Sequence, residues 1–140
     1  MSRVFWDTNL FIYLVEAHPK HAQRVVELRR RMLDRRDQLY TSTLTLGEVL
    51  VKPVEMRNEA LRRSYERAMT IGVVLISLDQ DAARIYAQIR QDRSLRAPDT
   101  IQLACAAKAQ VDLFITNDDR LSGKVVPGIQ FIVSLEKAFL

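Results

Sequence analysis

The sequence predicts an α/β fold in which a central parallel sheet of four to five strands is flanked by helices. Two observations support this prediction. Short apolar segments recur along the 140 residues, and segments with helical spacing of apolar residues separate them. Strands that alternate with helices in this way pair in parallel. The composition, 48% hydrophobic and 27% charged, is that of a globular protein.

Five segments are expected to be strands because each is short, apolar and bounded by polar residues or by a helix start. These segments are residues 3–7, 39–42, 73–76, 113–116 and 130–133. Gly72 precedes the third segment and is expected to stop the helix before it, since glycine tolerates backbone conformations that helices do not use.

Six segments between and beside these strands are expected to be helices, at residues 10–15, 19–33, 45–51, 58–70, 79–89 and 98–107. Thr8 or Asn9 can cap the first helix. Pro53 is expected to end the third, because the residue before a proline avoids helical geometry. The last helix is apolar nearly all round, which predicts that it is buried.

The whole chain, residues 1–140, is expected to form one domain, since its length is ordinary for one and no linker or repeat interrupts it. No signal peptide and no run of about 20 apolar residues is visible, so we expect no membrane contact. The single cysteine, Cys105, fits a cytoplasmic protein without disulfides. The net charge of +4 favours nucleic acid as a partner, but only modestly.

Four acidic residues lie where predicted strands end or helices begin. Asp7 ends the first strand, Asp118 follows the fourth, and Glu48 and Asp99 each lie in the first turn of a predicted helix. In parallel sheets sites form beyond the carboxyl ends of strands, so these acids are expected to meet. Clustered carboxylates repel one another and therefore call for a cation. Oxygen ligands alone favour Mg²⁺ or Mn²⁺ over zinc.

Each acid also has a purely structural explanation. Residues 45–48 match a capping box, in which Glu48 would bond back to the start of its helix. Asp99 could complement a helix dipole, and Asp118 could belong to an ordinary capped turn. Asp7 is the hardest to explain in this way, because aspartate is depleted in strands. The joint placement of the four acids, more than any single one, indicates a metal site.

Four motifs carry these acids: W-D-T-N at residues 6–9, L-G-E-V at 46–49, P-D-T-I-Q-L-A at 98–104 and T-N-D at 116–118. In content and order they resemble the motifs of PIN domains, and more narrowly those of VapC-type ribonuclease toxins from toxin–antitoxin pairs. The resemblance implies that Asp7, Glu48, Asp99 and Asp118 are catalytic acids that bind one or two Mg²⁺ or Mn²⁺ ions.

The same resemblance implies that the side chains of Asn9 and Thr116 support the acids. Asp119 directly follows Asp118, so either carboxylate could face the metal. Asp118 is favoured because it holds the third place of the T-x-D pattern.

Two arginines, Arg93 and Arg96, lie just before the P-D motif and are candidates for contacts with RNA phosphates. The partners that the resemblance implies are an RNA substrate, a cognate antitoxin protein and a second copy of the chain in a homodimer.

The expected function is endoribonuclease activity, in which a metal-activated water attacks a backbone phosphorus. A catalytically silent PIN-like module that only binds RNA or protein is the alternative. A haloacid-dehalogenase-type phosphatase fits less well, since it would need a second aspartate where Asn9 stands. A nucleotide-binding fold lacks its glycine-rich phosphate loop.

Overall fold

The computed structural model describes residues 1–138, and residues 139–140 of the predicted domain lie outside the described residues. The strands are β1 (Arg3–Trp6), β2 (Gln38–Ser42), β3 (Val73–Ile76), β4 (Leu113–Thr116) and β5 (Phe131–Ser134). The helices are α1 (Thr8–Val15), α2 (Ala22–Arg35), α3 (Thr43–Glu55), α4 (Glu59–Thr70), α5 (Gln80–Ile89) and α6 (Ala97–Lys108). Each predicted strand is present to within one residue. No helix among residues 1–138 combines the length and the apolar character that crossing a membrane requires.

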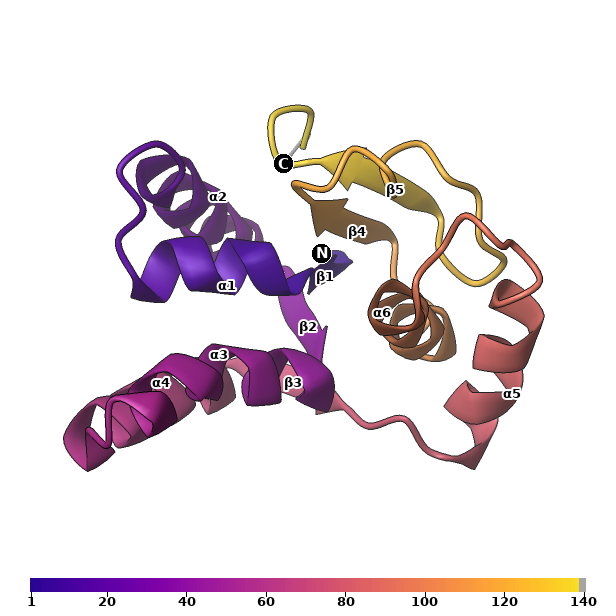
Figure 1. The fold of residues 1–140 in the computed structure, drawn as a ribbon. Coiled ribbons are helices and arrows are strands. Elements are labelled where there is room, and N and C mark those ends of the chain that lie inside the picture. The colour runs from indigo at the N-terminus through magenta and orange to yellow at the C-terminus, as the bar shows by residue number, and fades with distance from the viewer. Residues whose placement is uncertain (139–140) are drawn as a thin grey trace.

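The strands form one parallel sheet in the order β3-β2-β1-β4-β5, which confirms the predicted fold class (Figure 1). From β1 the chain moves outward through β2 to β3, and it then returns to the other side of β1 for β4 and β5. The order therefore reverses between β1 and β4. In sheets of this kind a crevice opens beyond the carboxyl ends of the strands at the reversal, and ligands bind there.

Alternation along β1 divides the core into two layers. Val4 and Trp6 face the side covered by α1, α2, α3 and α4, whereas Phe5 faces the side covered by α5 and α6 (Figure 1). Phe5 stacks on Phe114 of β4, with ring centroids 5.0 Å apart. All four side chains are fully buried, and each such burial stabilises the fold by roughly 1.5 to 3 kcal/mol. This packing fixes β1 and so fixes the position of Asp7 at its end.

Pro53 does not end α3, contrary to the prediction. The helix continues to Glu55, and Pro53 is buried inside its last turns. A proline removes one backbone hydrogen bond, and near the end of a helix that loss is small. The next bonds are intact, since the N–H of Met56 donates to the carbonyl of Lys52 at 3.0 Å. Burial of the ring offsets what the missing bond costs.

Candidate active site

Asp7 lies at the reversal of strand order, as the cap of α1. Its backbone N–H donates to the carbonyl of Ile115 at 3.0 Å, so the chain stays paired with β4 one residue beyond β1. Oδ1 accepts the backbone N–H of Thr8 at 2.9 Å, and Oδ2 accepts the hydroxyl of Thr116 at 2.7 Å. The predicted cap, Thr8 or Asn9, was wrong: the acid itself caps the helix.

Burial raises the pKa of the Asp7 carboxyl to about 6. The hydrogen bonds from Thr116 and Thr8 act in the opposite direction, and the charges of Asp99 and Glu48 raise the pKa further. Asp7 is only 7% exposed. Asp99 of α6 and Glu48 of α3 therefore lie close enough to Asp7 to repel it, and a cation among them would relieve that repulsion.

Glu48 does not form the capping box that its sequence allows. The cap of α3 is Ser42, three residues before Thr45, so Glu48 lies beyond the first turn of the helix. Its Oε1 instead accepts the hydroxyl of Thr8 at 2.8 Å. Thr8 follows Asp7 directly, so this bond holds Glu48 beside the end of β1.

Asp99 lies in the first turn of α6 with a side chain that is 16% exposed. Two guanidinium groups flank it. Nε of Arg96 is 3.5 Å and Nη2 of Arg120 is 3.9 Å from its Oδ2. The predicted neighbour Arg96 thus lies at the site. Arg93 is exposed, and within residues 1–138 no hydrogen bond or ion pair joins it to the acids.

Asp118 follows β4 and forms an ion pair with Arg120. Nε and Nη2 of Arg120 donate to its two carboxylate oxygens at 3.0 and 2.6 Å, and this pair lowers the pKa of Asp118. The backbone N–H of Asp118 donates to the Thr116 hydroxyl at 3.0 Å. Asp119 is exposed. Of the two neighbours, Asp118 is therefore the one that is tied to Asp99 and to Asp7.

Asn9 supports the loop after β4. Its side-chain oxygen accepts the backbone N–H of Asn117 at 3.3 Å, and the side chain of Asn117 in turn donates to the hydroxyl of Tyr13 at 2.9 Å. Tyr13 packs against His18 and His21, with ring centroids 4.9 and 4.6 Å away. Asn9 thereby links α1 to the segment that carries Asp118.

Gln102 is a site residue that the sequence analysis missed. Its side-chain amide donates to the hydroxyls of Thr8 and Thr45 at 2.8 and 2.7 Å, and its oxygen accepts the hydroxyl of Ser42. Gln102 is 2% exposed. A polar residue in the middle of an apolar helix was the available signal, because such a side chain needs partners when buried. Arg120 was also missed, and nothing local to its sequence marks it.

The donor set fits a hard divalent cation. Asp7, Glu48, Asp99 and Asp118 offer only carboxylate oxygens, which suit Mg²⁺ or Mn²⁺. Within residues 1–138, no three acidic, histidine or cysteine side chains already converge as a ligand group. Asp118 is turned to Arg120 rather than to the other acids. Ligation of a cation by Asp118 would therefore require its pairing with Arg120 to change.

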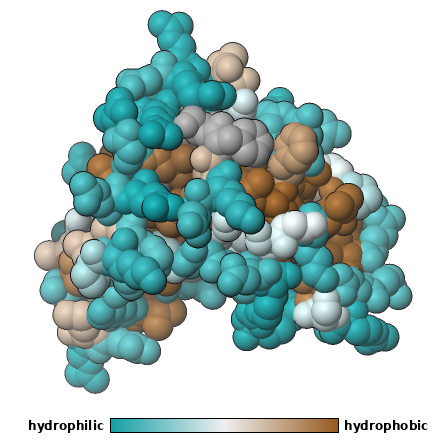
Figure 2. All heavy atoms as spheres, turned by 90° about the horizontal axis from the view of Figure 1, so that it is seen from above, coloured by the Kyte–Doolittle hydropathy of each residue, from teal (hydrophilic) through white to brown (hydrophobic). Residues whose placement is uncertain are grey.

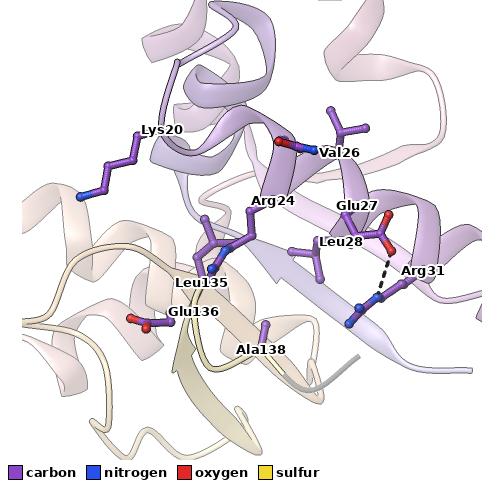
Figure 3. Close-up of a pocket in the computed structure, with 10 residues that line it drawn as sticks. Lys20, Arg24, Val26, Glu27, Leu28, Arg31, Leu135, Glu136 and Ala138 are labelled. Carbon is purple, nitrogen blue, oxygen red and sulfur yellow. Dashed lines mark hydrogen bonds and ion pairs between the residues drawn. The ribbon is translucent and has the colours of Figure 1, made fainter.

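A groove of about 860 Å³ lies elsewhere, between α2 and the segment after β5. Figure 3 shows Arg24 and Leu28 of α2 facing Leu135, with Glu27 paired to Arg31 beside them. From above, Figure 2 shows apolar side chains in a strip with hydrophilic margins on this side of the molecule. The groove holds none of the four acids, so it is separate from the candidate active site.

Comparison with known proteins identifies the fold. The PIN domain family profile matches residues 4–125. The structure resembles a toxin–antitoxin complex from Klebsiella pneumoniae, with a TM-score of 0.63 and 24% identity over 90% of this chain and 94% of that one. It also resembles DNA-bound VapBC from Salmonella typhimurium, with a TM-score of 0.72 and 20% identity over 96% and 99% of the two chains.

A third similar structure is Mycobacterium tuberculosis VapC20, described as a sarcin-ricin loop cleaving toxin. Its TM-score is 0.59, with 16% identity over 79% of this chain and 86% of that one. No curated protein sequence matches the chain. The resemblance of the four motifs to PIN domains is confirmed by the profile match, which covers most of the sequence. The chain belongs to the PIN-domain family.

Proposed function

We propose that the chain is an endoribonuclease that depends on Mg²⁺ or Mn²⁺ and serves as the toxin of a type II toxin–antitoxin pair. One observation carries the proposal: Asp7 is buried at the reversal of strand order, where burial raises its pKa and the nearby charges of Asp99 and Glu48 raise it further. A buried carboxylate that lies beside other acids costs stability unless a cation binds there. Such a site is what hydrolysis of a phosphodiester bond needs.

The residues of the chain have separable tasks in this proposal. Asp7, Asp99, Glu48 and Asp118 would hold the ion. The ion, when bound, supplies an activated water for attack on phosphorus and offsets charge on the phosphate oxygens. The hydroxyl of Thr116 and the N–H of Thr8 keep Asp7 in one orientation.

RNA as the substrate class, and the toxin role, rest on the similar structures. VapC20 from Mycobacterium tuberculosis is described as a sarcin-ricin loop cleaving toxin, which supports RNA. The Klebsiella pneumoniae structure is a toxin–antitoxin complex, and the Salmonella typhimurium structure is a VapBC assembly. We therefore propose a cognate antitoxin protein, a homodimer as the working form, and action in the cytoplasm.

A binding-only PIN module is the second candidate. The ion pairs of Arg96 and Arg120 with the acids favour it, because they already neutralise Asp99 and Asp118 in part without any metal. In that case the purified chain would bind RNA or protein and would not cut RNA with any divalent ion.

Cleavage of RNA by the purified chain separates the two candidates. We expect cleavage with Mn²⁺ or Mg²⁺, none in EDTA, and recovery when the ion is restored. Asp7→Asn and Asp99→Asn should each abolish cleavage. Asp81→Asn is the matched control, since Asp81 is exposed on α5 and its carboxylate forms an ion pair with Arg84. Wild-type rates for both Asp7→Asn and Asp99→Asn would refute the site.

A further inference from the structure

Arg120 joins two acids that reach the site from different parts of the fold. Asp99 comes from the start of α6, and Asp118 comes from the loop after β4. Nη2 of Arg120 is 2.6 Å from Asp118 Oδ2 and 3.9 Å from Asp99 Oδ2. A positive group of the chain therefore stands where the carboxylates alone would repel one another.

We propose that Arg120 is a built-in counterion of the acidic site, which a divalent cation displaces and which then binds the RNA phosphate. This inference rests on the proposed function. In the metal-free protein the guanidinium holds Asp118 and lies beside Asp99. When a cation takes those carboxylates, the guanidinium leaves them and becomes available to the substrate.

The hydrogen bonds of Asp118 place Arg120 in competition with a bound cation. Its Oδ1 accepts both the backbone N–H and Nε of Arg120, each at 3.0 Å, and its Oδ2 accepts Nη2. The two parallel bonds from the guanidinium occupy both oxygens in the fork geometry that arginine and carboxylate favour. A metal ion bound by Asp118 would therefore meet the positive charge of Arg120 at the same carboxylate and compete with it there.

The surroundings of Arg120 allow its side chain to move while its backbone stays in place. The side chain is 52% exposed. The next residue, Leu121, is fully buried in the core that α6 covers, which anchors the loop. The backbone N–H of Arg120 remains on Asp118 Oδ1 if the side chain turns away, so Asp118 keeps its orientation.

A released Arg120 would carry its charge at the edge of the acidic site, where a phosphate must approach. The planar guanidinium matches phosphate oxygens with two parallel hydrogen bonds, which makes arginine suited to such contacts. Arg96 differs, because its Nε lies 3.5 Å from Asp99 and none of the described contacts shows a hydrogen bond to Asp118. Arg96 therefore competes less strongly than Arg120 with a cation for the carboxylates.

The test measures Mn²⁺ binding to the purified protein without RNA, by calorimetry or by electron paramagnetic resonance. We expect Arg120→Ala to bind Mn²⁺ about fivefold to tenfold more tightly than wild type, because a competing positive charge is gone. Arg120→Lys keeps the charge but not the fork, so its affinity should lie between the two. Arg84→Ala removes an exposed arginine paired with Asp81 on α5 and should bind like wild type.

The second measurement is RNA cleavage at saturating Mn²⁺, with thermal unfolding of every variant as the check on folding. Arg120→Ala should bind metal more tightly and yet show a lower kcat/KM, a combination that a merely structural role would not give. Equal or weaker Mn²⁺ binding by Arg120→Ala would overturn the inference while leaving the nuclease proposal intact. Tighter binding with an unchanged kcat/KM would overturn the phosphate contact. A wild-type protein that binds no Mn²⁺ would defeat the proposed function itself, and the inference with it.

Discussion

The hydroxyl of Thr116 donates a hydrogen bond of 2.7 Å to Oδ2 of Asp7, across the point where the strand order reverses. The hydroxyl oxygen of Thr116 also accepts the backbone N–H of Asp118 at 3.0 Å. One buried side chain at the end of β4 thus holds both the acid after β1 and the acid after β4. Hydrogen bonds of this kind are strong in surroundings that exclude water.

Replacing Thr116 with valine should raise the pKa of Asp7 above its value of about 6, because the Thr116 hydroxyl lowers it more than any other group does. It should also destabilise the fold by about 1 to 3 kcal/mol, since the partly buried N–H of Asp118 loses its partner. Carboxyl NMR titration and urea unfolding measure the two effects. Thr116→Ser keeps the hydroxyl and is the control. An unchanged Asp7 pKa in the valine variant would contradict the role of this bond.

The stability of the metal-free protein should depend on pH through Asp7. Burial raises the pKa of this carboxyl from 3.8 to about 6. Between these values the folded protein keeps a proton that the unfolded chain has released, so the free energy of unfolding falls as pH rises from about 4 to about 6. The full difference, reached above pH 6, is about 2 to 3 kcal/mol. Urea unfolding in EDTA from pH 4 to 8 measures it.

Asp7→Asn isolates this effect from the other titrating groups. An asparagine carries no charge, so the variant should gain about 2 to 3 kcal/mol relative to wild type between pH 4 and 8. Mn²⁺ at pH 8 should raise the melting temperature of wild type more than that of the variant, because a ligand stabilises the state that binds it. Parallel stability curves for the two proteins would rule out a raised Asp7 pKa.

The side chain of Gln102 should contribute more to the free energy of unfolding than an exposed glutamine side chain does. Gln102→Leu leaves the buried hydroxyls of Thr45 and Ser42, and the partly buried hydroxyl of Thr8, without the side chain that now pairs with them. The expected loss is about 2 to 3 kcal/mol, which urea unfolding resolves. Gln88→Leu, at an exposed position of α5, should change stability by less than about 0.5 kcal/mol. Equal effects at the two positions would mean that the network contributes little.

Local pattern was enough to predict the sheet and the place of Asp7. Alternation of side chains is a property of a few consecutive residues, so strands can be predicted from the sequence. The carboxyl end of a parallel strand then determines which edge of the sheet an acid occupies. Asp99 lies in the first turn of a helix, as the sequence predicted, whereas Glu48 was expected in a first turn and lies beyond the first turn of α3.

Contacts between residues far apart in the chain could not be predicted from the sequence. Gln102 meets Thr8 across 94 residues, and Arg120 meets Asp99 although most of α6 and all of β4 lie between them in the chain. The predicted end of the third helix was wrong for a related reason. Tertiary packing carries α3 past Pro53, where local propensity alone predicts a stop.

Asp118 and Asp119 provide a matched pair for the last prediction, since they are the same residue type at adjacent positions. Asp118 is tied to Thr116 and Arg120, whereas Asp119 is exposed. Asp118→Asn should lower RNA cleavage at least about tenfold, a loss that even the outer partners of metal ligands typically produce. Asp119→Asn should cost much less. Cleavage rates at saturating Mn²⁺ measure both, with thermal unfolding as the check on folding. If Asp119→Asn is the more damaging change, the loop turns Asp119 toward the metal instead, and the assignment of Asp118 is wrong.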